Sequence, residues 1–262
     1  MASEEFINNY VKQRSLSWVF KRFVAERSIQ LYFALAIVCS TLLFSNFYAS
    51  GFNLEVMLGE LGIWKLLGAM AFGWGLYLIQ EYIAHVWVFH MPAPANPKWY
   101  KYLYRLHMGH HDMPKRLDIL ITPFWFTLPV LMLNMFGFYA VTSSIDITLA
   151  ATLGLVLGYI EFEWFHLLVH SPYSCKTRWL KFIQKRHMAH HYITEKRWFT
   201  VTPLGSLLDD LFLTGGRVET ATPSNNPKNG ELSKDDPRLI YARKYYNLSS
   251  STPDSDANLT VK

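Results

Sequence analysis

The sequence predicts an all-α integral membrane protein, with four apolar membrane helices in two hairpins and a cytosolic helical cap that holds a histidine-rich di-metal site. Three observations predict this class. Four apolar runs interrupt a chain of 262 residues that is 51% hydrophobic and 16% aromatic. Nearly all lysines and arginines lie outside these runs, and all ten histidines fall into four short clusters. A chain with such a high apolar content is not disordered, and its length is typical of one or two domains.

The apolar runs suit a bilayer crossing, which takes about 20 predominantly apolar residues. They cover residues 29–50, 62–84, 120–141 and 147–165. Pro123 and Pro129 lie in the third run, so we expect this run to be kinked or interrupted. The hairpin 120–165 therefore either spans the membrane or dips into it without crossing.

The positive charges orient these helices. Of the 25 lysines and arginines, 24 lie in the N-terminal segment, in the loop 91–118 or after residue 170. Cytosolic loops of membrane proteins are enriched in these residues. We therefore expect both termini, the middle loop and every histidine cluster on the cytosolic side. The membrane would be the endoplasmic reticulum in a eukaryote or the inner membrane in a bacterium.

Composition divides the chain into three parts. Residues 1–28 form a basic cytosolic segment without the features of a cleaved signal peptide, and 29–217 form the membrane domain. After residue 217 the chain becomes rich in Ser, Pro, Asn and charged residues. We expect 218–262 to be a mostly disordered cytosolic tail, with a short helix around 238–246.

The histidine clusters are two close pairs, each followed by an H-x-x-H-H triad. In chain order the clusters are His85 and His90; His107, His110 and His111; His166 and His170; and His187, His190 and His191. On an α-helix the positions i, i+3 and i+4 share one face, so each triad should present its three imidazoles together. A spacing of five does not share a face, so we expect the first pair to lie at a helix end or beside a helical distortion.

Ten clustered imidazoles are more than one ion can hold. They suit two metal ions with about five ligands each, or eight ligands with two further histidines beside them. A lone histidine on a helix is usually an ordinary polar residue, but two triads and two pairs, with no histidine elsewhere, favour a polynuclear site. Imidazole suits zinc, copper, iron and nickel. Thiolate ligation is excluded because Cys39 lies in an apolar run and Cys175 stands alone.

Carboxylates are expected close to such a site, because neutral imidazoles leave the charge of two ions uncompensated and because carboxylates orient imidazole N–H groups. The candidates are Glu81, Asp112, Glu161, Glu163, Asp209 and Asp210, of which we favour Glu81, Glu163 and Asp209. For each of these residues alone, an ordinary helix cap or surface charge is an equally good interpretation.

The four clusters lie in the motifs EYIAHVWVFH, HMGHH, GYIEFEWFHLLVH and LKFIQKRHMAHHY, and a fifth motif without histidine, LLDDLFLTG, follows them, all within about residues 78–216. In this order they resemble the fatty acid hydroxylase and sterol desaturase superfamily of membrane di-metal enzymes. The first and third motifs are most similar to the fatty acid 2-hydroxylase branch. The family's acidic position before the third cluster corresponds to Glu163, and the one before its Phe-x-Thr ending corresponds to Asp209.

The resemblance implies that 29–217 is the catalytic domain of an O2-dependent lipid hydroxylase, and that all ten histidines bind two iron ions. Zinc could replace iron in the purified protein. The implied substrate is the acyl chain of a fatty acid or of a sphingolipid such as ceramide. Many eukaryotic relatives carry a fused cytochrome b5 domain, whose His-Pro-Gly-Gly haem motif does not occur in this sequence. Electrons would then come from a separate donor of the cytochrome b5 or ferredoxin type.

Other functions stay open. Sterol desaturation, sterol methyl oxidation and carotenoid ring hydroxylation use similar histidine sets, although the spacings of the two pairs favour the fatty acid branch. A metal transporter needs polar ligands near the bilayer midplane, where these runs are almost purely apolar. A zinc hydrolase needs only three protein ligands. No feature of the sequence indicates a nucleic-acid partner.

Overall fold

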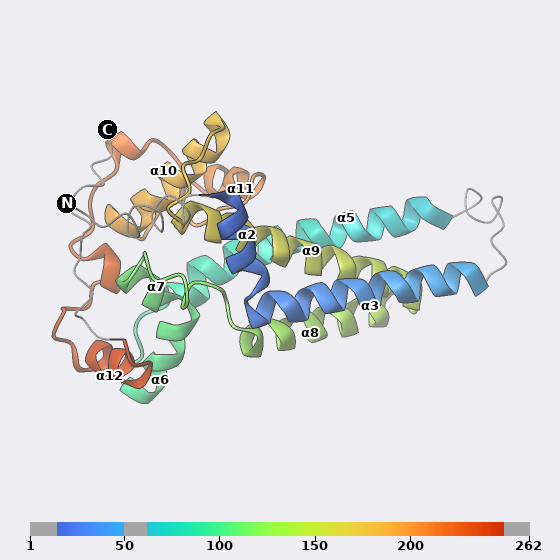
Figure 1. Ribbon diagram of the computed structural model, residues 1–262, viewed down its shortest axis with the longest axis horizontal. Coiled ribbons are helices and arrows are strands. Elements are labelled where there is room, and N and C mark those ends of the chain that lie inside the picture. The colour runs from blue at the N-terminus through green and yellow to red at the C-terminus, as the bar shows by residue number, and fades with distance from the viewer. Residues whose placement is uncertain (1–14, 50–61, 249–262) are drawn as a thin grey trace. The chain divides into compact units, whose positions relative to one another are not determined.

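The computed structural model describes residues 15–49 and 62–248, which form helices and connecting loops without a β-strand (Figure 1). The predicted all-α class is confirmed. Two compact units make up the chain. We call them the membrane-helix unit, Met1–Tyr82 and Ile121–Tyr173, and the histidine unit, Ile83–Leu120 and Ser174–Lys262. The first half of the predicted N-terminal segment and the end of the predicted tail lie outside the described residues.

The described part of the membrane-helix unit is built from helices. These are α2 (Leu16–Val24), α3 (Arg27–Ala49), α5 (Gly62–Ile83), α8 (Phe124–Thr142) and α9 (Ile145–His170). Side chains cap two of them, because Ser15 accepts a hydrogen bond from the amide of Trp18 and Ser144 accepts one from Ile147. Pro129 lies inside α8 without ending it. A proline removes only one backbone hydrogen bond, so the interruption that the sequence allowed does not occur.

Four helices are long and apolar enough to cross a membrane. They are Arg27–Ala49, Gly62–Phe89, Phe124–Thr142 and Ile145–His170. This confirms the four predicted membrane helices, and the fourth extends five residues beyond its predicted end at 165. His166 and His170 therefore belong to the last turns of α9.

Helix α9 is the central helix of the membrane-helix unit, where it packs against α2, α3 and α8. Small residues bring α5 against it as well. A Cβ atom on Gly154 would lie 2.0 Å from the carbonyl oxygen of Met70, and one on Gly73 would lie 1.9 Å from that of Ala151. The two backbones approach this closely because glycines lie on both sides, as is common where membrane helices pack.

The histidine unit consists of short helices around a compact core. They are η1 (Ala84–Phe89), α6 (Pro97–Leu103), η2 (Tyr104–Met108), α7 (Gly109–Asp112), α10 (Arg178–Tyr192), α11 (Gly205–Leu211), η3 (Val218–Thr220), η4 (Pro227–Asn229) and α12 (Pro237–Tyr245). Side chains at the N-cap position begin several of these helices. Asn96 and Asp236 each cap a helix that begins with proline, and Thr177 caps α10.

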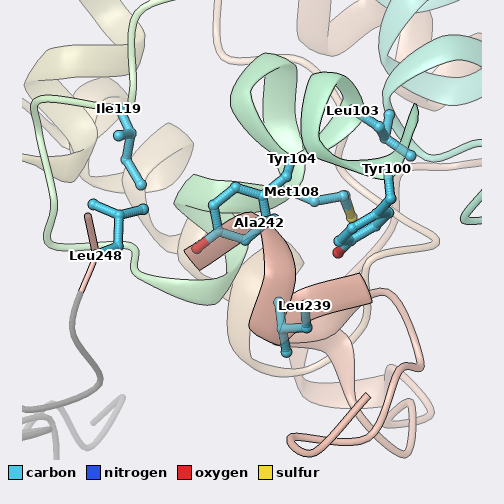
Figure 2. Packing of buried hydrophobic residues seen from close by; sticks show 8 residues of the cluster. All are labelled: Tyr100, Leu103, Tyr104, Met108, Ile119, Leu239, Ala242 and Leu248. Carbon is cyan, nitrogen blue, oxygen red and sulfur yellow. The ribbon is translucent and has the colours of Figure 1, made fainter. Parts of the chain in front are cut away.

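The chain after residue 217 is folded as far as Leu248, which corrects the predicted disordered tail. Helix α12 confirms the short helix expected around 238–246 and packs against α6. Figure 2 shows the core that they share: Tyr100, Leu103, Tyr104, Met108, Ile119, Leu239, Ala242 and Leu248. The segment is polar on average, but its few apolar residues are spaced to meet the aromatic face of α6 and η2. The average composition of the segment after residue 217 therefore did not predict this packing.

Candidate metal centre

The first histidine pair lies on a π-helical turn. In η1 the backbone N–H of His90 donates to the carbonyl of His85, five residues earlier, at 3.2 Å. Such a turn brings residues at i and i+5 to the same side of the helix. The two imidazoles consequently stack, with ring centroids 5.2 Å apart and planes 7° apart. The helical distortion that the spacing of five predicts is therefore present.

Four histidines of the histidine unit close a ring through their Nε2 atoms. The Nε2 of His107 lies 3.0 Å from that of His90 and 3.0 Å from that of His111. The Nε2 of His190 lies 3.1 Å from that of His111 and 3.1 Å from that of His90. His85 joins this set, and its ligand atom and those of the other four lie within 4.8 Å of one another. We call these five residues the first histidine group.

The spacing of these nitrogens fits a bound metal ion. Metal–imidazole bonds are about 2.1 Å long, so adjacent ligands at about 90° have nitrogens about 3.0 Å apart, whereas tetrahedral ligands have nitrogens about 3.4 Å apart. The contacts of 3.0–3.1 Å match the first arrangement. Four or more ligands at such angles are typical of a metal with five or six ligands, as the first histidine group would provide.

The electrostatics of this group suit metal binding, because a ligand must be neutral. Burial, followed by repulsion from neighbouring histidines, holds the pKa of His90, His107 and His111 well below its usual value. Burial also lowers the pKa of His190 to about 4. Near neutral pH these imidazoles therefore stay uncharged and can offer a lone pair to a cation.

The remaining histidines of the histidine unit gather beside the first group. The Nε2 of His191 lies 3.1 Å from that of His187, and the rings of His110 and His191 have centroids 5.1 Å apart. Each triad is thus divided. His107 and His111 point to one group and His110 to the other, while His190 separates from His187 and His191. The prediction that each triad presents its three imidazoles together is wrong.

The third cluster is on α9, in the membrane-helix unit. His166 and His170 are both buried one turn apart, and their ring centroids are 4.9 Å apart. Glu163 lies one turn earlier and is fully buried, with one oxygen accepting the amide of Thr122 at 2.8 Å. Its other oxygen is 4.0 Å from the Nδ1 of His166, which is beyond hydrogen-bond distance.

The backbone, rather than a carboxylate, orients His190. The Nδ1 of this histidine donates to the carbonyl oxygen of Arg197 at 2.7 Å. A proton on Nδ1 leaves the Nε2 lone pair free for a metal, which is the usual way in which a second contact fixes a metal-binding histidine. Phe199, two residues further on, packs edge-on against the rings of His85, His90 and His190.

The candidate carboxylates have different surroundings. Glu81 is buried one turn before His85. Asp209 is buried and accepts hydrogen bonds from Phe199, Thr200 and Thr214. The other candidates bond elsewhere: Asp112 to Tyr104 and Arg243, Glu161 to Trp74, and Asp210 to Arg186.

Sequence reasoning missed Arg197, Phe199 and Arg243. A backbone carbonyl acceptor has no signature in the side-chain sequence, so Arg197 could not be found. For Phe199, its place shortly after the last triad was the only signal. Arg243 lies 131 residues from its partner Asp112, in a short helix that we expected within a mostly disordered tail, and nothing in the sequence pairs the two residues.

Four membrane-length helices together with a buried polyhistidine ring define a helical membrane protein of the metal-binding type. A family model described as fatty acid hydroxylase matches residues 70–214, which is more than half of the chain. The chain therefore belongs to the fatty acid hydroxylase family, as its motifs indicate.

Several relatives share this similarity. Fatty acid 2-hydroxylase from Rattus norvegicus is 24% identical over 139 residues, which are 52% of this chain and 37% of the rat protein. The enzymes from Mus musculus and Homo sapiens are each 22% identical, over 71% of this chain and 45% of theirs. The chain thus spans less than half of these relatives.

A solved structure of full-length Scs7p, in which only the hydroxylase domain is visible, shares the fold. The TM-score is 0.58 at 19% identity, covering 74% of this chain and 69% of that one. Together with the family model, these findings confirm the resemblance to the fatty acid 2-hydroxylase branch.

Proposed function

We propose that this protein is a membrane-bound di-iron oxygenase that hydroxylates the acyl chain of a lipid, most simply a fatty acid or a ceramide, using O2. The observation that carries the proposal is the ring of four Nε2 atoms at 3.0–3.1 Å, in a member of the fatty acid hydroxylase family. The fatty acid 2-hydroxylases among its relatives support an acyl chain as the substrate.

In this proposal all ten histidines bind metal, five to each ion. One ion takes the first histidine group. The other takes His110, His187 and His191, and the resemblance to the family implies that His166 and His170 are metal ligands as well. The argument for ligands beyond His110, His187 and His191 is chemical. Three neutral imidazoles alone would give a redox-active metal ion few protein ligands. Zinc would fit the same donors but has no redox chemistry.

The metal pair, when bound, supplies O2 activation and the oxidation of a C–H bond. The chain supplies binding, orientation and exclusion of water. The histidines hold the ions as neutral ligands, Arg197 fixes the proton of His190 on Nδ1, and Phe199 covers three of the ligand rings. Glu163 and Glu81, one turn before His166 and His85, are proposed to compensate the positive charge of the ions.

The proposal includes the cellular setting. The charge pattern supports a cytosolic metal centre and an orientation with both termini in the cytosol. It also supports the division into a basic segment before residue 29, a catalytic domain and a cytosolic C-terminal segment. Electrons are proposed to come from a separate donor of the cytochrome b5 or ferredoxin type.

Lipid mass spectrometry with isotopically labelled O2 tests this function. Cells that express the protein should gain one labelled oxygen on acyl chains. A double variant with His107→Ala and His111→Ala, made at matched expression, should gain none. Labelled sterols or carotenoids in place of acyl chains would move the protein to a sister activity of the family. No labelled lipid in cells that contain a working electron donor would refute the proposal.

A further inference from the structure

We propose that Asp209 is a positioning residue for the metal centre, which it reaches through a strained turn at Arg197 and Trp198. Asp209 holds the turn, and the turn delivers a backbone carbonyl to His190. The inference rests on the proposed metal centre, because the orientation of His190 matters to function only if its Nε2 binds an ion.

His190 is the ligand that the turn controls. Its Nδ1 donates to the carbonyl of Arg197 at 2.7 Å, while its Nε2 closes the ring between His90 and His111. Without that carbonyl, the imidazole could rotate about its χ2 angle or move its proton to Nε2. Either change would remove one corner of the ring.

The turn itself is strained. Trp198 has a φ of 58°, in the left-handed region that bulky residues rarely adopt, although its side chain is completely buried. Such a conformation costs about 1–3 kcal/mol and persists only where the surroundings enforce it. Two hydrogen bonds do so directly: the amide of Trp198 donates to the carbonyl of Thr214, and its indole N–H donates to that of Gly216.

Asp209 fixes the chain immediately after this turn. Its Oδ1 accepts from the amide of Phe199 at 3.0 Å and from the hydroxyl of Thr214 at 2.8 Å. Its Oδ2 accepts from the amide of Thr200 at 3.1 Å and from the hydroxyl of the same residue at 2.6 Å. The carboxylate therefore links Phe199 and Thr200, which follow the turn, to Thr214.

Burial makes this arrangement sensitive to change. Asp209 is 1% exposed, and burial raises its pKa, an effect that the four hydrogen bonds oppose. An asparagine has the same shape but its amide nitrogen cannot accept a hydrogen bond. Asp209→Asn would therefore leave one backbone amide, that of Phe199 or of Thr200, facing a donor, whereas the threonine hydroxyl on the same side can rotate and accept. The chain after the turn would lose a contact that helps to balance the strain at Trp198.

Replacement of Asp209 should weaken the binding of one metal ion only. The turn contacts the first histidine group twice, through the Arg197 carbonyl and through the ring of Phe199 against His85, His90 and His190. A positioning role therefore predicts selective weakening of the ion that this group holds. A general loss of stability would instead weaken both ions.

The test is the rate at which metal leaves the purified full chain in detergent. The protein is loaded with Fe(II) without oxygen, and metal release to an excess of chelator is followed by absorbance. Asp209→Asn should release one ion about 10–100-fold faster than the wild type, and the other ion at the wild-type rate. The fast ion should be the one that a His90→Ala variant fails to retain.

Three further variants act as controls. Asp118→Asn removes an exposed carboxylate that pairs with Arg116, and should release both ions at wild-type rates. Thr200→Val deletes one hydrogen bond to Asp209 and should accelerate the same ion less. Thr200→Ser retains the hydroxyl and should restore the wild-type rate. If the Asp209→Asn variant does not fold, comparison of Thr200→Val with Thr200→Ser tests the inference instead.

Two outcomes would overturn the inference: equal acceleration of both ions, or unchanged release in both Asp209→Asn and Thr200→Val. If the proposed metal centre itself is wrong, the wild-type protein would retain no ion at all. That result is distinguishable from failure of the inference on Asp209.

Discussion

At the scale of single residues, the division of each triad explains how two H-x-x-H-H motifs serve two groups of ligands. Positions i and i+4 are about 40° apart on a helix, whereas i+3 and i+4 are about 100° apart. The outer histidines of a triad therefore point together, as His187 and His191 do, and the middle one points to the side. In this way His190 joins the group to which His107 and His111 belong.

Arg243 is a second residue whose role is visible only in the folded chain. Its guanidinium bonds both carboxylate oxygens of Asp112, which also accepts the hydroxyl of Tyr104 at 2.7 Å. Asp112 directly follows His111 and its side chain is only 4% exposed. The ion pair therefore links α12 to the helix that carries the second cluster.

We predict that Arg243→Met destabilises the protein by about 3 kcal/mol, because it leaves the buried carboxylate of Asp112 without its cation. Thermal unfolding in detergent measures this loss. Lys244→Met removes the neighbouring positive charge, which is exposed, and should leave the melting temperature nearly unchanged. Equal melting temperatures for the two variants would show that the ion pair contributes nothing.

At the scale of elements, glycines set the packing of α5 on α9. Gly154 lies where a Cβ would be 2.0 Å from a backbone oxygen, whereas a Cβ on Gly75 of α5 would have no atom within 4 Å. A backbone atom cannot move aside as the end of a flexible side chain can. The helices must therefore separate if Gly154 is replaced.

We predict that Gly154→Ala lowers stability by about 1–3 kcal/mol through overpacking. Gly75→Ala makes the same chemical change at an open position and should be neutral or slightly stabilising. Unfolding of both variants in the same detergent compares them directly. If they unfold alike, close contact between α5 and α9 is not required for stability.

Helix α12 completes the core of the histidine unit. Leu239 and Ala242 are completely buried and share their cluster with Tyr100 and Tyr104. A chain that ends at residue 217 would expose this aromatic surface.

We predict that the chain ending at residue 217 aggregates, or loses its cooperative unfolding transition. A chain ending at residue 248 retains every packing contact described for this segment and should unfold like the full chain. Size-exclusion chromatography and thermal unfolding compare the two. A soluble, cooperatively folded 1–217 chain would show that α12 is dispensable.

At the scale of the whole molecule, the sequence predicts the parts that repeat along the chain. The four membrane-length helices follow from apolar runs, and the clustered histidines follow from spacing, including the distortion between His85 and His90. Sequence could not predict contacts that depend on backbone atoms or on distant segments. The carbonyl of Arg197 is of the first kind, and the pairing of Arg243 with Asp112 is of the second.

The central claim is that the histidines hold two metal ions, each in its own group. The most direct measurement is the metal content per chain of the purified, iron-loaded protein, determined by elemental analysis. The account predicts two ions in the wild type and one in a His90→Ala, His111→Ala double variant. It also predicts one ion in a His187→Ala, His191→Ala double variant. A wild-type protein that holds one ion or none, at full occupancy of folded chain, would contradict the account.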